Sequence, residues 1–260
     1  MKCRILFVTY MCIIFTSSAQ LVRIDTIKAT NPYFKKSHYI FPKIKIANHK
    51  VIADSINKDL ISDFLQIEPN EVKKSIFENI WATSANTTPS LADISFEIHR
   101  IDRFIFSISI SAEGCGAYCE YFTANYNYDL RTGKRIKMAS LFTQAGLQFI
   151  SDSVLSFKKL TLKNKINETK DTLKINMDST EKNYYRDMLD LYETCLEKTD
   201  EFTVEDIPCY INKNEIIFIL DRCSVHYNRN LDELGDFIIP FQIKRLKFLS
   251  NYGKKLLEDE

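Results

Sequence analysis

The chain has few of the residues that interrupt regular structure, with six glycines and six prolines among 260 residues. Long disordered linkers are rich in such residues, so we expect ordered structure over most of the length. The chain also lacks an excess of charge of either sign, with a formal net charge of +1. A near-neutral balance argues against a nucleic-acid-binding protein.

Several catalytic motifs are absent as well. The sequence contains no Gly-x-Ser-x-Gly of a serine hydrolase, no His-Glu-x-x-His of a metalloprotease and no phosphate-binding loop. The four histidines are scattered along the chain. No cofactor and no metal site is therefore indicated, and an enzyme is the less favoured class.

The N-terminus has the pattern of a secretory signal peptide over residues 1–19. Lys2 and Arg4 precede an apolar run over residues 5–15, and small residues end at Ala19. That run is too short to span a membrane, and no later run reaches spanning length. We expect an exported protein, periplasmic or extracellular, that starts at Gln20 and has no membrane span. With Lys2 and Arg4 removed, 33 basic and 34 acidic residues leave a net charge of −1.

Hydrophobic periodicity predicts helices and strands in clusters. Apolar residues spaced by three and four predict a helix in 48–67 with Asn48 as its N-cap, and a short helix in 68–81 capped by Asn70. Alternation predicts strands over 93–114 joined by a turn near Asp102, and a third strand over 118–130. Gly133 is expected to take positive φ in the next turn. An early extended segment contains Pro42, which predicts an edge strand or a break.

The second half adds two long helices, a hairpin and a last strand. One helix is expected from residue 144 to about 163, then a polar loop over 164–180, and a second helix over 181–198 capped by Thr180. A hairpin turning at 212–214, a strand over 236–242 and a C-terminal helix over 243–260 follow. This order predicts an α+β fold, with helices packed on a mainly antiparallel sheet. Residues 20–260 form one domain, or two subdomains with a break near 82–91.

The segment "AEGCGAYCEYF" is the most distinctive stretch for function. Export permits disulfides, and five cysteines remain after residues 1–19, enough for two bonds and one thiol: Cys115, Cys119, Cys195, Cys209 and Cys223. A Cys115–Cys119 bond requires a turn, which Gly114 and Gly116 permit, because an extended strand would separate the two Cα atoms by about 13 Å. If the loop is straight, a Cys119–Cys223 bond is the second choice.

A disulfide-stiffened loop would present Tyr118, Glu120 and Tyr121 as a ligand-binding surface. Tyrosine is favoured at interfaces, although aromatic residues at Tyr118, Tyr126 and Tyr128 also suit a sheet's buried face. Two chemical alternatives use the same cysteines. Cys115, Cys119, Cys223 and His226 have the number but not the usual spacing of zinc ligands. Cys119 or Cys223 with His226 would make a thiol enzyme or hydrolase.

Three stretches resemble the extracytoplasmic domain of RsiV-type anti-sigma factors and PdaC-type peptidoglycan deacetylases, a domain of unknown function. They are "FPKIKIANHKVIADSIN", "NYNYDLRTGKRIKMASLF" and "FIIPFQIKRLKFL", which together touch residues 39–257. The family commonly has Gly-Gly-Ala-His-Pro where this chain reads Gly114 to Cys119, with Tyr118 in place of histidine. We expect no sigma-binding segment and no deacetylase domain, so neither anti-sigma activity nor deacetylation is carried over from the family.

The resemblance implies a fold and an extracytoplasmic recognition role. In the anti-sigma members that role is binding lysozyme. We therefore expect a non-enzymatic exported binding module of a bacterial envelope. Its partner would be a cell-wall glycan or an envelope-directed protein such as a lysozyme.

The first prediction concerns export. N-terminal sequencing of the exported protein should begin at Gln20 or within a few residues of it, because the apolar run and the small residues before Gln20 match a signal-peptidase site. A soluble cytosolic protein that retains Met1 would contradict the prediction.

Overall fold

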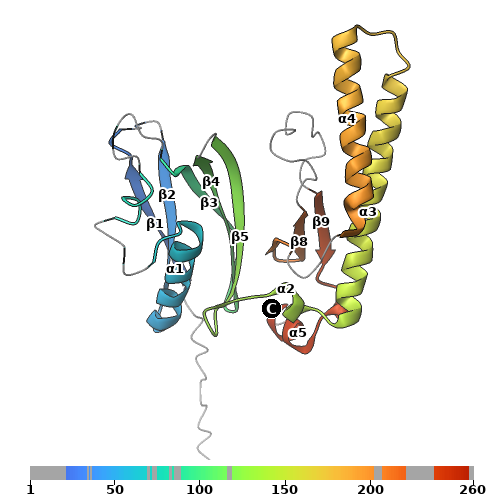
Figure 1. Ribbon diagram of the computed structural model, residues 1–260. Helices are drawn as coiled ribbons and strands as arrows, with labels where there is room; N and C mark the ends of the chain where they lie inside the picture. Colours follow the sequence, from blue (N-terminus) through green and yellow to red (C-terminus); the bar gives the residue numbers. More distant parts are fainter. Residues whose placement is uncertain are drawn as a thin grey trace, which may run out of the picture.

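The computed structural model describes residues 22–33, 35, 37–68, 71, 75–81, 84, 89–115, 119–201, 207–220 and 237–257. Its elements form a large sheet with one helix on it, a small sheet, and a long helical hairpin beside the small sheet (Figure 1). The expected signal peptide lies outside the described residues, as do Asn70, Gly116, Tyr118, Cys223 and His226. None of the helices in the described ranges is long and apolar enough to cross a membrane.

The large sheet has six strands in sequence order. They are β1 (Val22–Thr30), β2 (His38–Ile46), β3 (Leu91–Ile101), β4 (Ile105–Cys115), β5 (Cys119–Asp129) and β6 (Lys134–Arg135). Neighbours pair antiparallel except β2 and β3, which run parallel and meet at Tyr39 and Ile94. The expected α+β fold with a mainly antiparallel sheet is confirmed.

The strands on either side of residues 82–91 belong to this one sheet, since β2 and β3 are neighbours. Pro42 lies in β2, between two strands, and not at the edge that its missing N–H suggested. The position tolerates proline because β2 pairs with β3 only at Tyr39. The N–H group that Pro42 lacks is therefore not needed for a hydrogen bond between β2 and β3.

Alternation in β4 and β5 gives the large sheet one apolar and one polar face. The side chains of Phe106, Ile108 and Ile110 are fully buried in the core under α1 (Lys50–Phe64). Tyr126 and Tyr128 of β5 join that core, as the aromatic spacing predicted. The residues between them, beginning with the serines of "SISIS", lie on the opposite face.

Helix α1 starts one residue later than expected. His49 occupies the N-cap position, and Asn48 has a φ of 61°. Asparagine tolerates this left-handed conformation, so Asn48 makes the turn from β2 into the helix and does not cap it. The second helix expected in this region is also wrong. Residues 76–80 form turns, which still bury Phe77 completely.

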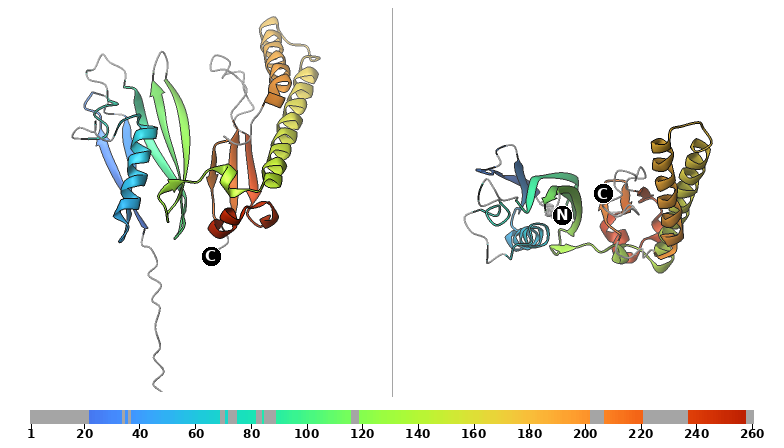
Figure 2. Two further views of the ribbon diagram at one scale, coloured as in Figure 1. Left: turned by 60° about the horizontal axis from the view of Figure 1, so that its bottom comes forward. Right: turned by 45° about the horizontal axis from the view of Figure 1, so that its top comes forward.

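The expected polar loop over 164–180 is helical for most of its length. Helix α3 runs Gln144–Thr172 and α4 runs Ser179–Glu197, with a short turn between them. Asp178 caps α4, where Thr180 was expected, because its carboxylate accepts from the backbone N–H groups of Thr180 and Glu181. The two helices stand out from the rest of the molecule (Figure 2). They share a small core: Leu162, Ile166, Met188, Tyr192 and Cys195.

The small antiparallel sheet contains β7 (Cys209–Ile211), β8 (Glu215–Leu220) and β9 (Phe237–Gln242), in that order. The hairpin expected at 212–214 is confirmed. Helices α2 (Met138–Leu141) and α5 (Asn251–Leu257) pack with this sheet and the start of α3 in a second core. The described residues also include the 3₁₀ turns η1 (Lys198–Glu201) and η3 (Leu246–Phe248), and α5 starts later than the helix expected there.

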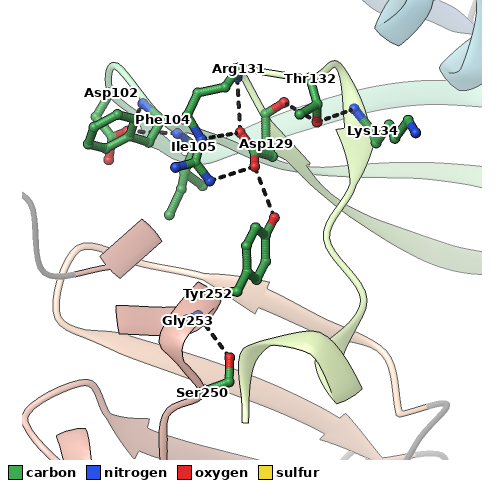
Figure 3. A network of polar contacts seen from close by, with 10 residues as sticks. All are labelled: Asp102, Phe104, Ile105, Asp129, Arg131, Thr132, Lys134, Ser250, Tyr252 and Gly253. Atoms are coloured by element: carbon green, nitrogen blue, oxygen red, sulfur yellow. Dashed lines mark hydrogen bonds and ion pairs between the residues drawn. The ribbon is translucent and has the colours of Figure 1, made fainter. Parts of the chain in front are cut away.

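A polar network joins the large sheet to the C-terminal helix (Figure 3). Asp129, at the end of β5, accepts two hydrogen bonds from the Arg131 guanidinium, at 2.7 and 2.9 Å. The hydroxyl of Tyr252 in α5 donates to the same carboxylate at 3.0 Å. Burial alone would raise the pKa of Asp129, but these donors hold the pKa below the usual value. The carboxylate therefore stays charged and keeps the two parts together.

The turn that follows Asp129 depends on Gly133, which has a φ of 70° as expected. A Cβ at this position would lie 3.3 Å from both Cγ2 and the carbonyl oxygen of Ile52 in α1. We expect Gly133→Val to destabilise the protein by about 1–2 kcal/mol, because the left-handed conformation disfavours a β-branched residue.

Thermal unfolding measures this loss. A decrease of roughly 2–8 °C in Tm is expected for a chain of this size. Lys134→Val is the matched control, because it places the same side chain at the next residue, which is exposed at the start of β6. An unchanged Tm in Gly133→Val would show that the turn does not need glycine.

Candidate functional site

A groove of about 1120 Å³ lies between the polar face of the large sheet and the small sheet. Strands β3, β4 and β5 form its floor, and the small sheet forms the facing wall. The floor carries alternate side chains of "SISIS" and "TANYN", which the strand period turns away from the core under α1. The site is therefore a consequence of the same alternation that builds the core.

The floor is a ladder of paired hydroxyl and amide groups. Ser109 Oγ donates to Asn125 Oδ1 at 2.5 Å, and the hydroxyls of Ser111 and Thr123 lie 2.8 Å apart. The Asn125 side chain thus presents its amide nitrogen as a donor, which has no hydrogen-bond partner within the described part of the chain. Such groups match hydroxyl and carbonyl groups of a ligand.

His99 enters the floor through a β-bulge. Ile98 pairs with Ile108 and Arg100 with Ser107, so His99 is the extra residue of β3. Its imidazole hydrogen-bonds Ser109 and stacks on Tyr210 of β7, with ring centroids 3.9 Å apart. Burial lowers the pKa of His99, against the opposing effect of Glu97, so the imidazole is neutral at neutral pH.

The wall is apolar, whereas the floor is polar. Pro208, Tyr210, Ile219 and Ile238 line it, and Ile238 is 54% exposed. The charged side chains among the described lining residues are Glu97 and Glu120, with no lysine or arginine. The groove thus suits a neutral or cationic ligand that has one polar and one apolar side, and it does not suit a phosphate.

Glu120 and Tyr121, two of the three residues expected to bind a ligand, line the rim of this groove. The Tyr121 side chain is 58% exposed, and its hydroxyl donates to Asp93 at 3.4 Å. Gly114 lies on the same rim. Their role in binding stays a prediction. Sequence reasoning did not find Asn125, His99 or Tyr210, although the polar residues alternating with isoleucine in β4 and β5 were a signal for the floor.

A disulfide joins Cys115 to Cys119, with Cα atoms 4.1 Å apart. The two residues are partners at the end of the β4–β5 ladder, so the bond closes the tip of this hairpin. The first of the two expected pairings is confirmed, and the Cys119–Cys223 pairing is wrong. Because the sulfur of Cys119 is bonded, Cys119 is neither a thiol nucleophile nor a zinc ligand.

Of the other cysteines, Cys195 is also disulfide-bonded and Cys209 is a free, buried thiol. Desolvation raises the pKa of Cys209 to about 12, which makes it a poor nucleophile. Within the described ranges no group of three or more His, Cys, Asp and Glu side chains is placed to hold a metal ion.

The whole fold is similar to a solved structure of the DUF3298 family, the RsiV/PdaC-type domain. This protein, from Bacteroides fragilis, has 15% sequence identity and a TM-score of 0.52, and the match covers 93% of this chain and 98% of that chain. A DUF3298 protein from Pseudomonas aeruginosa has 8% identity and a TM-score of 0.46, over 89% and 95% of the two chains. No family model and no curated protein matches the sequence. The fold that the resemblance implied is confirmed.

The state of the cysteines generates the third prediction. The folded, non-reduced protein should react slowly or not at all with a thiol reagent, and the guanidinium-unfolded protein should show one thiol, located at Cys209 by peptide mapping. Cys209→Ala, which removes the one free thiol of the described residues, should show none in either state. A fast-reacting thiol in the folded protein would contradict the prediction.

Proposed function

We propose that the chain is an exported, non-enzymatic binding module of a bacterial envelope, and that the groove between the two sheets binds a cell-wall glycan. The observation that carries the proposal is the two-sided chemistry of the groove. A pyranose ring presents C–H groups on its faces and hydroxyl or acetamido groups around its rim. The apolar wall suits the faces, and the hydroxyl and amide ladder of the floor suits the rim.

The size and charge of the groove support an extended, uncharged ligand. Its volume of about 1120 Å³ exceeds the roughly 300–1,000 Å³ of sites for small molecules. Side chains that already hydrogen-bond each other, such as Ser109 and Asn125, are held in place before the ligand arrives. This preorganisation lowers the entropy cost of binding.

The geometry of the floor argues against hydrolysis at the same place. Ser109 and His99 are hydrogen-bonded, as a nucleophile and its base would be. However, Ser109 donates its proton to Asn125, so His99 is left to donate to Ser109, the reverse of a general base's role. Glu97 lies 4.0 Å from His99 Nδ1, too far to orient the ring by a hydrogen bond. A thiol enzyme using Cys119 is excluded by the disulfide.

The fourth prediction is that the mature protein binds neutral oligosaccharides of N-acetylglucosamine, which carry the hydroxyl and acetamido groups of a cell-wall glycan and no charge. Asn125→Ala and Tyr210→Ala should each weaken binding by about tenfold, since each removes one polar or one stacking contact. Isothermal titration calorimetry provides the measurement. Tyr184→Ala is the control, because it removes a tyrosine that is 38% exposed on α4, in the helical hairpin, and does not line the groove.

Two outcomes would contradict the proposal. One is the absence of binding to these neutral oligosaccharides. The other is equal weakening by Asn125→Ala and Tyr184→Ala, which would place the glycan away from the groove.

A further inference from the structure

Strand β5 forms an open edge of the large sheet. Its neighbour β6 pairs only with Tyr128 and Asp129, so residues 119–126 have no partner strand on that side in the described part of the chain. Three backbone hydrogen bonds show which groups face outward. Leu130 N–H donates inward to Phe104, whereas the carbonyls of Asn127 and Asp129 accept from Ile136 and Gly133 on the outer side.

Because backbone groups alternate along a strand, the N–H and C=O of Tyr121, Thr123 and Asn125 point to the same outer edge as those of Asn127. Among the described residues no hydrogen bond to these edge groups is found. A row of donors and acceptors at two-residue spacing is matched by another extended polypeptide, which carries the same groups at the same spacing.

The two outer edges of this sheet differ in side chains. Strand β1, at the opposite edge, carries Arg23, Asp25 and Lys28, and Asp25 forms ion pairs with Arg23 and with Lys45 of β2. Charged residues of this kind protect an edge from pairing. From Tyr121 to Asn125, β5 carries no charge, no proline and no bulge, and its register with β4 is unbroken. The β5 edge is thus left competent to pair.

A cavity that can accept side chains lies on each face of the sheet next to the β5 edge. On the side of α1, a pocket of about 310 Å³ is lined mainly by apolar groups that include Phe64, Phe122 and Ala124. Phe122 is 41% exposed and stacks on Phe64 at 5.5 Å between ring centroids. On the other side lies the polar groove, which Tyr121, Thr123 and Asn125 line. Alternate residues of an added strand would enter the pocket and the groove in turn.

We propose that the β5 edge binds an extended segment of a partner protein. The segment adds to the large sheet as a further strand beside residues 119–126 of β5, where β6 does not pair. The segment has apolar side chains on the face toward α1 and neutral or basic side chains on the face toward the groove. The basic preference follows from Glu97 and Glu120 on the groove and from Glu113, which lies opposite Tyr121 in the β4–β5 ladder.

The partner is a different chain, and not a second copy of this one. A second copy would bring the same acidic groove and no lysine or arginine among its described lining residues, so like charges would meet. The disulfide at the tip of the hairpin fixes the start of β5. The edge is thereby held in a strand conformation before the segment binds, which favours association.

The experiment uses the mature protein and a labelled ten-residue peptide in which valine alternates with lysine and serine. Fluorescence anisotropy measures its binding. A second peptide of the same sequence carries N-methyl groups at alternate residues, which removes backbone donors and leaves the side chains intact. We expect binding of the first peptide and a loss of at least about tenfold for the second.

Matched substitutions test the edge in the protein. Thr123→Pro removes an outward N–H without breaking the ladder to β4, and it should weaken peptide binding by about tenfold or more. Thr123→Val is the control, because it loses the same hydroxyl contact with Ser111 but keeps the N–H. Hydrogen exchange should slow at Tyr121, Thr123 and Asn125 when the peptide binds, and stay unchanged at the β1 edge.

Three results would overturn the proposal. The first is no peptide binding up to about 1 mM, the weak limit for such contacts. The second is that the N-methylated peptide binds as tightly as the unmethylated peptide, or that the Thr123→Pro variant binds the peptide as tightly as the unsubstituted protein. The third is a concentration-dependent dimer in sedimentation that Thr123→Pro abolishes, which would assign the edge to a second copy. Because a peptide is the probe, failure of glycan binding leaves this test unaffected.

Discussion

The arrangement of the two sheets depends on two buried polar side chains, Ser107 and Asn127. The Asn127 amide oxygen accepts from Ser107 Oγ at 2.8 Å and from the backbone N–H of Ile211 at 3.1 Å, while its nitrogen donates to the carbonyl of Cys209 at 2.7 Å. The polar groups of both side chains are hydrogen-bonded. The desolvation of these groups when β7 packs on the polar face is therefore offset by hydrogen bonds. Removing the Asn127 side chain would take the donor from the buried carbonyl of Cys209, whereas the N–H of Ile211 would keep Ser107 as an acceptor.

The same contacts determine where the groove is. The Ser107–Asn127 pair lies near the end of β5 that continues into the Asp129 turn, where β7 covers the sheet. Arg100 reinforces this end by donating to the carbonyls of Asn212 and Lys213 in the β7–β8 turn, and Tyr252 does so by binding Asp129. Toward the hairpin tip the same polar ladder continues through Ser109 and Ser111, and no strand of the described residues is packed on it. The groove is thus the part of this polar face that β7 does not cover.

A feature of the fold or the site could be predicted from the sequence when the residues that determine it lie close together along the chain. Alternation in β4 and β5, the positive φ of Gly133 and the Cys115–Cys119 bond are local, and each was predicted. The length of α3 was missed because residues 164–172 are mostly polar. In this segment Ile166 and Thr169 are buried, and Ile166 is buried in the core that α3 shares with α4. The wall of the groove could not be predicted from the sequence, because the hydrogen bond from the Ile211 N–H to Ser107 Oγ joins residues 104 positions apart. Glu120 and Tyr121 were found because they flank the disulfide.

Strand β5 connects these observations, because each of its three sets of groups has a separate use. Its even-numbered side chains, such as Tyr126 and Tyr128, complete the core, and their hydroxyls donate to Asp63 and Asp59 of α1. Its odd-numbered side chains make the polar floor. Its odd-numbered backbone groups face outward along the edge. A strand that paired on both sides would have no open edge, and a strand in a sheet buried on both faces would have no polar floor. Within the described residues, the short β6, which pairs with only the last two residues of β5, leaves the edge open beside the polar floor.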